Sequence, residues 1–213
     1  MKTIKIDTPF GTAKAHLTGA DDPRAALVLG HGAGGGVQAK DLVAVAQVAH
    51  SVGLSVALVE QPYRVAGRRS PAPAQQLDAA WTAVIDYLFA DELRGLALLT
   101  GGRSSGARVA CRTAQAVGAE GVVCLAFPLQ PPRRSGGKPT QSRLYELDVV
   151  TVPTLVVQGS RDPFGIPPAT KSRTVAQVAG NHSLRTDLAA VGEAVRTWLL
   201  RVVIESHATR RSS

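Results

Sequence analysis

Apolar residues recur along the chain in two patterns, and the two patterns alternate. Apolar runs at residues 25–30, 54–59 and 96–100 are typical of strands that are buried on both faces of a sheet. The segment 75–93 instead repeats apolar residues at helical spacing, and its apolar face comprises Leu77, Trp81, Val84, Ile85 and Leu88. The chain is therefore expected to alternate between buried strands and amphipathic helices.

The complete set of expected elements follows from these patterns and from the glycines and prolines between them. Strands are predicted at residues 3–8, 12–17, 25–30, 54–59, 96–100, 121–127, 154–158 and 174–179. Helices are predicted at residues 41–52, 75–93, 104–117 and 186–204, with short helices near Leu144 and at 167–172. Residues 61–73 and the remainder of 128–147 are expected to be loops.

The order of these elements predicts the fold class. The first two strands are joined by Pro9-Phe10-Gly11, a turn of hairpin length. Repeated strand–helix units then predict an α/β fold, with a mostly parallel, twisted sheet and helices on both faces. The stretch 128–147 is too short for a lid domain. Residues 1–205 are expected to form one domain, followed by a polar, disordered tail at 206–213.

Composition narrows the class of protein. Of the 213 residues, 45% are hydrophobic and 19% are charged, which fits a globular protein. There is no run of 18 apolar residues, so no membrane span is expected, and residues 1–7 lack the apolar block of a secretory signal. Cys111 and Cys124 both lie in apolar stretches, which favours two buried free thiols in a cytoplasmic protein.

The formal net charge of +8 raises the question of nucleic-acid binding. Such binding usually needs a basic face with aromatic or helical readers, and the sequence shows none, so no nucleic-acid partner is expected. Two readings of the charge stay open. It is either a solvated basic surface or a field that draws an anionic substrate to the site.

The strongest chemical motif is Gly102-Arg103-Ser104-Ser105-Gly106. It lies between an apolar strand and a helical pattern, which is the context of a nucleophile elbow. Glycines two residues before and after the serine relieve crowding in a tight turn. About 0.1 match of this kind is expected by chance in such a chain, so the strand before and the helix after carry the argument. Ser104 is predicted to be a catalytic nucleophile.

A serine needs a base to activate it and an acid to orient that base. In chain order the acid should come before the histidine. His182 follows the last predicted strand, whereas His207 lies in the polar tail. Asp162 follows the strand at 154–158, while Asp148 precedes that strand and would lie at the wrong edge of the sheet. Asp162 and His182 are therefore the predicted acid and base.

The oxyanion of an acyl-transfer reaction needs two N–H donors. One is predicted to be the N–H of Ser105, directly after the nucleophile. The other is predicted to be Ala33 or Gly34, in the glycine-rich loop after the strand at 25–30. His31, in the same loop, is expected to have a structural role.

The same loop carries a competing motif. Gly30-His31-Gly32-Ala33-Gly34-Gly35 matches the dinucleotide-binding pattern, and Glu60 ends the next strand, where a ribose-binding acid would lie. A hairpin precedes the strand, however, and the helix starts later than this alternative requires. It also leaves Ser104, Asp162 and His182 without a role.

Along nearly its whole length the chain resembles the α/β-hydrolase superfamily. It is most similar to small lidless members related to dienelactone hydrolases, and within these to bacterial proteins related to the testis-expressed hydrolase-like group. The resemblance is carried by residues 29–35, 61–64, 101–108, 158–165 and 181–183. It implies a triad of Ser104, Asp162 and His182. Dienelactone hydrolases proper have a cysteine where this chain has Ser104, so their substrate is not implied.

The sequence thus predicts a serine hydrolase that cleaves a small acyl ester or thioester. The alternative is a binding protein that keeps the fold without useful catalysis. No cofactor and no metal is expected. Arg64, with Arg68 and Arg69 nearby, follows a strand end and could recognise a carboxylate or phosphate of the substrate, although a solvated basic loop is the competing interpretation.

Overall fold

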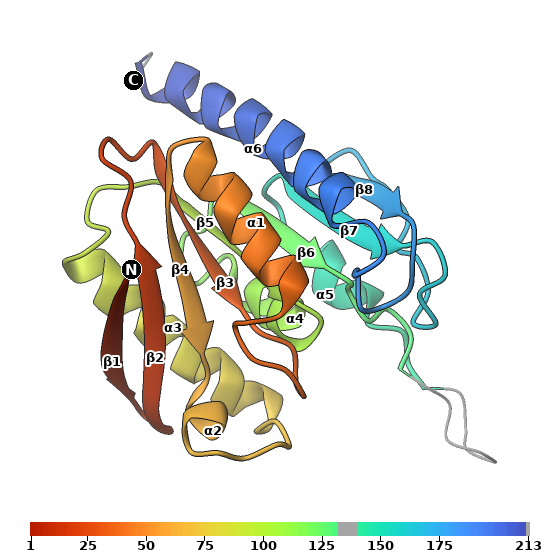
Figure 1. The fold of residues 1–213 in the computed structure, drawn as a ribbon, viewed down its shortest axis with the longest axis horizontal. Coiled ribbons are helices and arrows are strands. Elements are labelled where there is room, and N and C mark those ends of the chain that lie inside the picture. Colours follow the sequence, from red (N-terminus) through yellow and green to blue (C-terminus); the bar gives the residue numbers. More distant parts are fainter. Residues whose placement is uncertain (132–139, 212–213) are drawn as a thin grey trace.

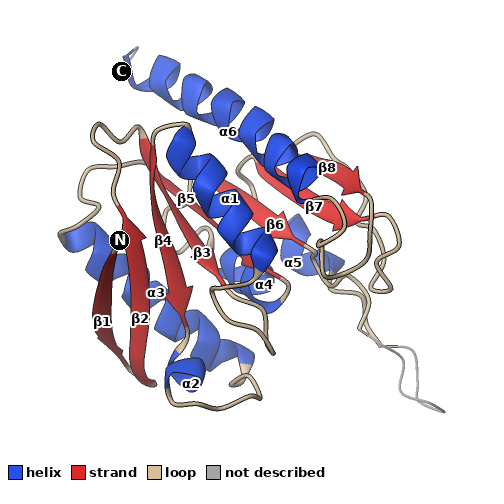
Figure 2. Ribbon diagram, in the orientation of Figure 1, coloured by secondary structure: helices blue, strands red, loops and turns tan. Residues whose placement is uncertain are grey.

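The computed structural model describes residues 1–131 and 140–211, and its core is one sheet of eight strands flanked by helices (Figures 1 and 2). The strands are β1 (Lys2–Thr8), β2 (Gly11–Thr18), β3 (Ala25–Gly30), β4 (Leu54–Glu60), β5 (Leu98–Arg103), β6 (Gly121–Leu125), β7 (Thr154–Gly159) and β8 (Arg173–Val178). The helices are α1 (Lys40–Ser51), α2 (Pro62–Val65), α3 (Ala74–Ala90), α4 (Ser105–Thr113), α5 (Leu144–Asp148) and α6 (Leu188–Arg211).

The sheet order is β1-β2-β4-β3-β5-β6-β7-β8. The hairpin of β1 and β2 is antiparallel, and β2 also pairs antiparallel with β4. All pairs from β4 to β8 are parallel, so the predicted mostly parallel sheet with an N-terminal hairpin is confirmed. Because parallel strands end at one edge, the connections after β3, β4, β5, β6, β7 and β8 gather there.

Two apolar cores form on the two faces of the sheet. Helices α1 and α6 lie over one face, and α3, α4 and α5 lie over the other (Figure 2). Leu27 and Leu29 of β3 pack into the first core, whereas Ala26 and Val28 pack into the second. Alternate residues of one strand therefore serve opposite cores, which explains why this strand is apolar throughout.

Some predicted elements were wrong in kind or extent. Residues 167–172 form no helix, because Pro167 and Pro168 cannot donate hydrogen bonds and disfavour helical geometry in the residue before each of them. The predicted loop 61–73 contains the helical turn α2. Helix α6 continues to Arg211, since residues 205–211 include no glycine or proline, so the predicted tail begins within this helix. Residues 212–213 lie outside the described part of the chain.

The connection between β6 and β7 contains the predicted short helix near Leu144, which is α5. The described residues of this connection are 126–131 and 140–153, and α5 is the only helix among them. These described residues form no lid domain. Residues 132–139 of the predicted loop lie outside the described part of the chain.

Candidate active site

The turn between β5 and α4 has the geometry of a nucleophile elbow. Ser104 adopts φ 52° and ψ −105°, which is strained for a residue with a side chain. Its N–H donates to the Leu125 carbonyl at 2.9 Å. A Cβ atom at Gly102 or Gly106 would lie 2.5 or 2.4 Å from the Gly30 carbonyl oxygen. Both glycines are therefore needed because the elbow packs directly against the backbone of β3.

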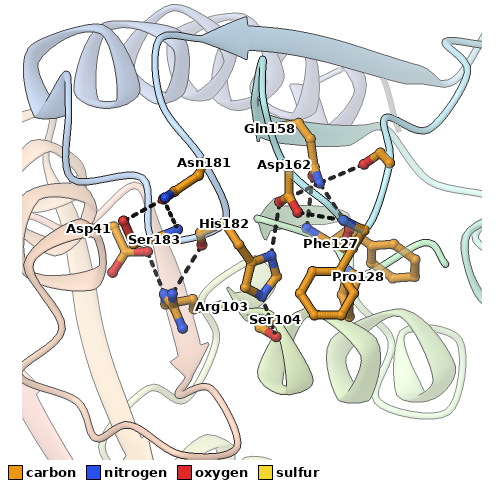
Figure 3. Close-up of polar contacts among 12 residues, drawn as sticks. Asp41, Arg103, Ser104, Phe127, Pro128, Gln158, Asp162, Asn181, His182 and Ser183 are labelled. Carbon is orange, nitrogen blue, oxygen red and sulfur yellow. Dashed lines mark hydrogen bonds and ion pairs between the residues drawn. The ribbon is translucent and has the colours of Figure 1, made fainter. Parts of the chain in front are cut away.

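Ser104, His182 and Asp162 form a continuous hydrogen-bonded chain (Figure 3). His182 Nε2 lies 3.0 Å from Ser104 Oγ, and His182 Nδ1 lies 2.8 Å from Asp162 Oδ2. Since an ionised carboxylate only accepts, Nδ1–H donates to Asp162 and Nε2 is left to accept the serine proton. The Asp162 carboxylate is fully buried, while the His182 ring is 20% exposed. The predicted nucleophile, base and acid thus lie in contact.

Gln158 of β7 holds the Asp162 carboxylate from behind (Figure 3). Its Nε2 donates to Asp162 Oδ2 at 2.8 Å, and the N–H of Phe164 donates to Oδ1 at 2.9 Å. The same Gln158 amide accepts from the Phe127 N–H and donates to the Phe127 carbonyl. Gln158 is completely buried, so the acid is fixed by the sheet itself. Sequence reasoning did not assign this role to Gln158.

The loop that carries His182 is packed tightly against the end of β7. A Cβ atom at Gly159 would lie 2.5 Å from the Asn181 carbonyl oxygen, so the loop needs glycine there to approach this closely. Asn181 Oδ1 accepts from the Ser183 N–H and hydroxyl. The Phe164 ring packs against the imidazole of His182 with centroids 4.4 Å apart. The loop backbone around His182 and the face of its imidazole ring are therefore both held by packing.

Arg103, at the second position of the elbow motif, contacts two other segments of the site (Figure 3). Its Nε donates to the Asp41 carboxylate at 2.8 Å, and its Nη2 donates to the His182 carbonyl at 3.0 Å. Neither contact was predicted, because both partners are distant in sequence.

The glycine-rich loop after β3 lies beside the elbow. A Cβ atom at Gly32 would lie 3.7 Å from Ser104 Cβ. The Tyr63 hydroxyl donates to the Ala33 carbonyl at 2.9 Å, while within the described residues no acceptor takes the N–H of Ala33 or Gly34. Ser105 is the first residue of α4, where the helix offers its N–H no acceptor. Within the described residues these N–H groups therefore have no acceptor, and their role as oxyanion donors stays a prediction.

His31 is held as a structural residue of this loop. Its Nδ1 lies 2.8 Å from the Gly32 carbonyl, and the Gln61 N–H donates to Nε2 at 3.1 Å. Because Nε2 accepts from the Gln61 N–H, the ring proton lies on Nδ1, which donates to the Gly32 carbonyl. Burial lowers the pKa of His31, which favours the same neutral form. This arrangement agrees with the structural role expected for His31.

The competing dinucleotide motif lacks its structural context. Helix α1 begins at Lys40, several residues after the last glycine of the loop, so no helix starts at the glycine-rich turn. Glu60 is bonded to His16 of the neighbouring β2, with 3.3 Å between His16 Nε2 and Glu60 Oε2.

Within the described residues, Arg64 and the two cysteines make no hydrogen bond to Ser104. In α2, Arg64 donates to the Arg68 carbonyl at 3.3 Å and has no described hydrogen bond to Ser104, Asp162 or His182. Cys111 and Cys124 are free and buried, as expected. Their sulfur atoms lie 3.4 Å apart, and the mutual hydrogen bond together with burial raises the pKa of Cys111.

Comparison with known proteins places the chain in a family. Residues 23–192 match the profile of the alpha/beta hydrolase domain. The chain belongs to the α/β-hydrolase family. No curated protein matches its sequence. The finer resemblance to the testis-expressed hydrolase-like group stays a prediction.

Solved structures share the α/β-hydrolase fold over nearly the whole chain. Est1E from Butyrivibrio proteoclasticus superposes with a TM-score of 0.77 at 16% identity, covering 96% of this chain and 100% of Est1E. A dienelactone hydrolase from Anabaena variabilis has a TM-score of 0.74 at 17% identity, covering 94% and 96%. A serine hydrolase without a lid from Xanthomonas campestris has a TM-score of 0.71 at 18% identity, covering 94% of each chain.

None of the helices in the described residues is long and apolar enough to cross a membrane.

Proposed function

We propose that this α/β hydrolase is a serine hydrolase that cleaves a small acyl ester or thioester through an acyl-enzyme. The observation that carries this proposal is the chain of hydrogen bonds from Ser104 through His182 to Asp162. An esterase domain from Rhodothermus marinus and the serine hydrolase from Xanthomonas campestris, both structural neighbours, support the same reaction class.

In the proposed first half-reaction, Ser104 Oγ attacks the acyl carbonyl while His182 Nε2 takes the hydroxyl proton. Asp162 remains ionised and stabilises the imidazolium that forms. The carbonyl oxygen becomes an oxyanion, which accepts from the N–H of Ser105 and from that of Ala33 or Gly34. His182 then gives its proton to the departing alcohol or thiol, and an ester bond joins the acyl group to Ser104.

In the second half-reaction, water replaces the departed alcohol or thiol. His182 takes a proton from this water as its oxygen attacks the acyl carbon. The bond to Ser104 breaks, Ser104 recovers its proton from His182, and the carboxylic acid is released. No cofactor or metal takes part in this scheme.

The decisive variant is Ser104→Ala. Loss of the nucleophile should reduce kcat for p-nitrophenyl acetate by about 10⁴- to 10⁶-fold and abolish labelling by a fluorophosphonate probe. Circular dichroism should show that the fold persists. Ser51→Ala, at the end of α1, is the matched control and should keep both activities. Undiminished labelling of Ser104→Ala would reject the assignment, and absence of any labelling or turnover in the parent protein would favour a non-catalytic binding protein.

The substrate is proposed to be anionic, because charge is distributed unevenly between the two edges of the sheet. Described connections at the carboxyl ends of the strands, where Ser104 lies, contain six arginines and two carboxylates: Arg64, Arg68, Arg69, Arg143, Arg161 and Arg185, with Asp162 and Asp187. Described loops at the opposite edge contain five carboxylates and three cations: Asp21, Asp22, Asp91, Glu92 and Glu120, with Arg24, Arg94 and Lys171. This polarity would draw an anion towards the site edge and would weaken at high salt.

Arg64 is the proposed binding residue for that anion, and paired substrates test it. Arg64→Ala should lower kcat/KM for an acyl ester bearing a free carboxylate by about tenfold, while the neutral ester of equal length is little affected. Arg94→Ala, at the opposite edge of the sheet, is the control. Equal preference for the two esters in the parent protein and in Arg64→Ala would reject anion recognition.

A further inference from the structure

The Arg103 guanidinium lies where three segments of the site meet. Its Nε bonds Asp41 of α1, and its Nη2 bonds the backbone carbonyl of His182. A Cβ atom at Gly32 would lie 2.8 Å from Nη1, so the glycine-rich loop passes directly over the guanidinium. Arg103 itself immediately precedes Ser104, and it therefore links the nucleophile to the other two loops.

The loop carrying His182 is held differently on its two sides. On the Asp162 side, the Arg161 N–H donates to the Gly180 carbonyl at 2.9 Å. On the Ser104 side, Arg103 supplies the one hydrogen bond to the His182 backbone that the described residues contain. Among the described residues, Arg103 is therefore the one hydrogen-bond anchor of the His182 backbone, whereas Asp162 and Phe164 hold the imidazole ring itself.

Asp41 fixes the direction of the guanidinium. Its side chain is 2% exposed, and both of its oxygens are occupied, Oδ1 by the Leu42 N–H and Oδ2 by Arg103. The planar guanidinium of an arginine can donate to a carboxylate and to a carbonyl at the same time. A lysine ammonium is a single compact donor group and cannot reach both positions in this way. Buried pairing with Asp41 thus leaves Nη2 aimed at the His182 carbonyl.

We propose that Arg103, oriented by Asp41, is a positioning residue that keeps His182 Nε2 within hydrogen-bond reach of Ser104 Oγ. This inference rests on the proposed serine-hydrolase function. Arg103 is expected to affect the chemical step and not substrate affinity, because its contact is with the backbone of the base His182. A misplacement of about 1 Å at a reacting centre costs on the order of 10²-fold in rate.

The first experiment separates kcat from KM. Arg103→Met should lower kcat for p-nitrophenyl acetate by about 10- to 100-fold while KM changes less than about threefold. Asp41→Asn should have a smaller effect of the same kind, and no further effect when Arg103 is already methionine. Arg103→Lys should recover only part of the rate.

Arg173→Met is the matched control. Arg173 also bonds one carboxylate, of Asp148, and one carbonyl, of Pro168, but it begins β8 at the opposite edge of the sheet. Its loss should reduce stability and leave kcat unchanged. If Arg173→Met loses as much kcat as Arg103→Met, the effect of Arg103 is merely structural and the inference is wrong.

Two further readouts separate a positioning role of Arg103 from a general loss of stability. Millimolar guanidinium chloride should restore part of kcat to Arg103→Ala and none to Arg173→Ala. Crystal structures should show His182 Nε2 beyond hydrogen-bond distance of Ser104 Oγ in Arg103→Met, but still at about 3.0 Å in Arg173→Met. An unchanged distance in Arg103→Met, or kcat within about twofold of the parent protein, would overturn the inference. If Ser104→Ala remains active, the proposed function fails instead, and the crystallographic distance alone decides the role of Arg103.

Discussion

The N-terminal end of α4 has polar groups without partners, whereas the charged side chains farther along the helix are paired. At the N-terminal end, Ser104 is held in a strained conformation, and the Ser105 N–H has no acceptor from its helix. Farther along the helix, charged groups are paired. Arg108 makes two bonds of 2.7 Å to Glu146. Arg112 makes bonds of 2.8 and 2.6 Å to Asp78.

This difference shows how the reactive end of α4 is supported. Strained and unsatisfied groups persist only where the surrounding structure over-determines them. The ion pairs of Arg108 and Arg112 tie α4 to α3 and α5, which keeps the helix in place while its N-terminus presents free donors. Substitutions at the N-terminal, reactive end should therefore reduce activity. Substitutions at Arg108 and Arg112, the supporting end, should reduce stability.

The largest expected effect is at Asp162, the acid of the triad that Ser104 completes at the N-terminal end of α4. Asp162→Asn should lower kcat/KM for p-nitrophenyl acetate by about 10⁴-fold, because the amide no longer stabilises the imidazolium or fixes the histidine tautomer. Its melting temperature should also fall, since both oxygens of the buried Asp162 carboxylate accept from N–H groups and the asparagine NH2 must face a donor at one of these positions. A decrease of kcat/KM smaller than about tenfold would show that Asp162 is not the orienting acid.

The second effect is at the supporting end. Arg108→Met leaves the buried Glu146 with Arg112 as its remaining strong partner, and should lower the free energy of unfolding by about 3 kcal/mol. Urea denaturation followed by circular dichroism measures this loss. The value of kcat at low temperature should stay within about twofold of the parent protein. A large loss of kcat in folded Arg108→Met would break the division between the two ends.

The smallest effect is the pH dependence of the supporting end. Burial opposes ionisation of Glu146, but hydrogen bonds and charges of Arg108 and Arg112 outweigh it and hold the pKa of Glu146 below 4.5. The unfolded chain therefore takes up this proton first as pH falls. The stabilisation is complete above the ordinary pKa and is lost as pH falls through the lowered one.

Glu146→Gln should consequently show a flatter dependence of stability on pH than the parent protein in mildly acidic solution. Urea denaturation of both proteins across this range gives the difference, which removes the common contribution of the other carboxylates. Parallel curves for the two proteins would mean that Glu146 does not titrate as this environment requires.

Much of the candidate site was predictable because each triad residue lies within four residues of the end of a strand. Ser104, Asp162 and His182 come after β5, β7 and β8, and parallel strands bring their carboxyl ends together regardless of sequence distance. The fold class followed in the same way from apolar runs and helical spacing. These features are local in the sequence, so a single chain reveals them.

The supporting residues were not predictable for the opposite reason. Arg103 bonds partners that lie 62 and 79 residues away, and Gln158 bonds the backbone of Phe127, 31 residues away. In the sequence, an arginine inside the elbow motif is equally consistent with a side chain that points into solvent. Burial and pairing of this kind depend on how distant segments pack, and no local pattern encodes that.

Gln158 has a consequence for the tolerance of this protein to redesign. By bonding both the N–H and the carbonyl of Phe127, its side chain imitates a neighbouring strand just where β6 has ended. Asp162 is anchored to the Gln158 side chain and not to the far part of the β7–β8 connection. That far part, beyond Gly165, could be lengthened or exchanged to admit other substrates while the acid keeps its distance from His182.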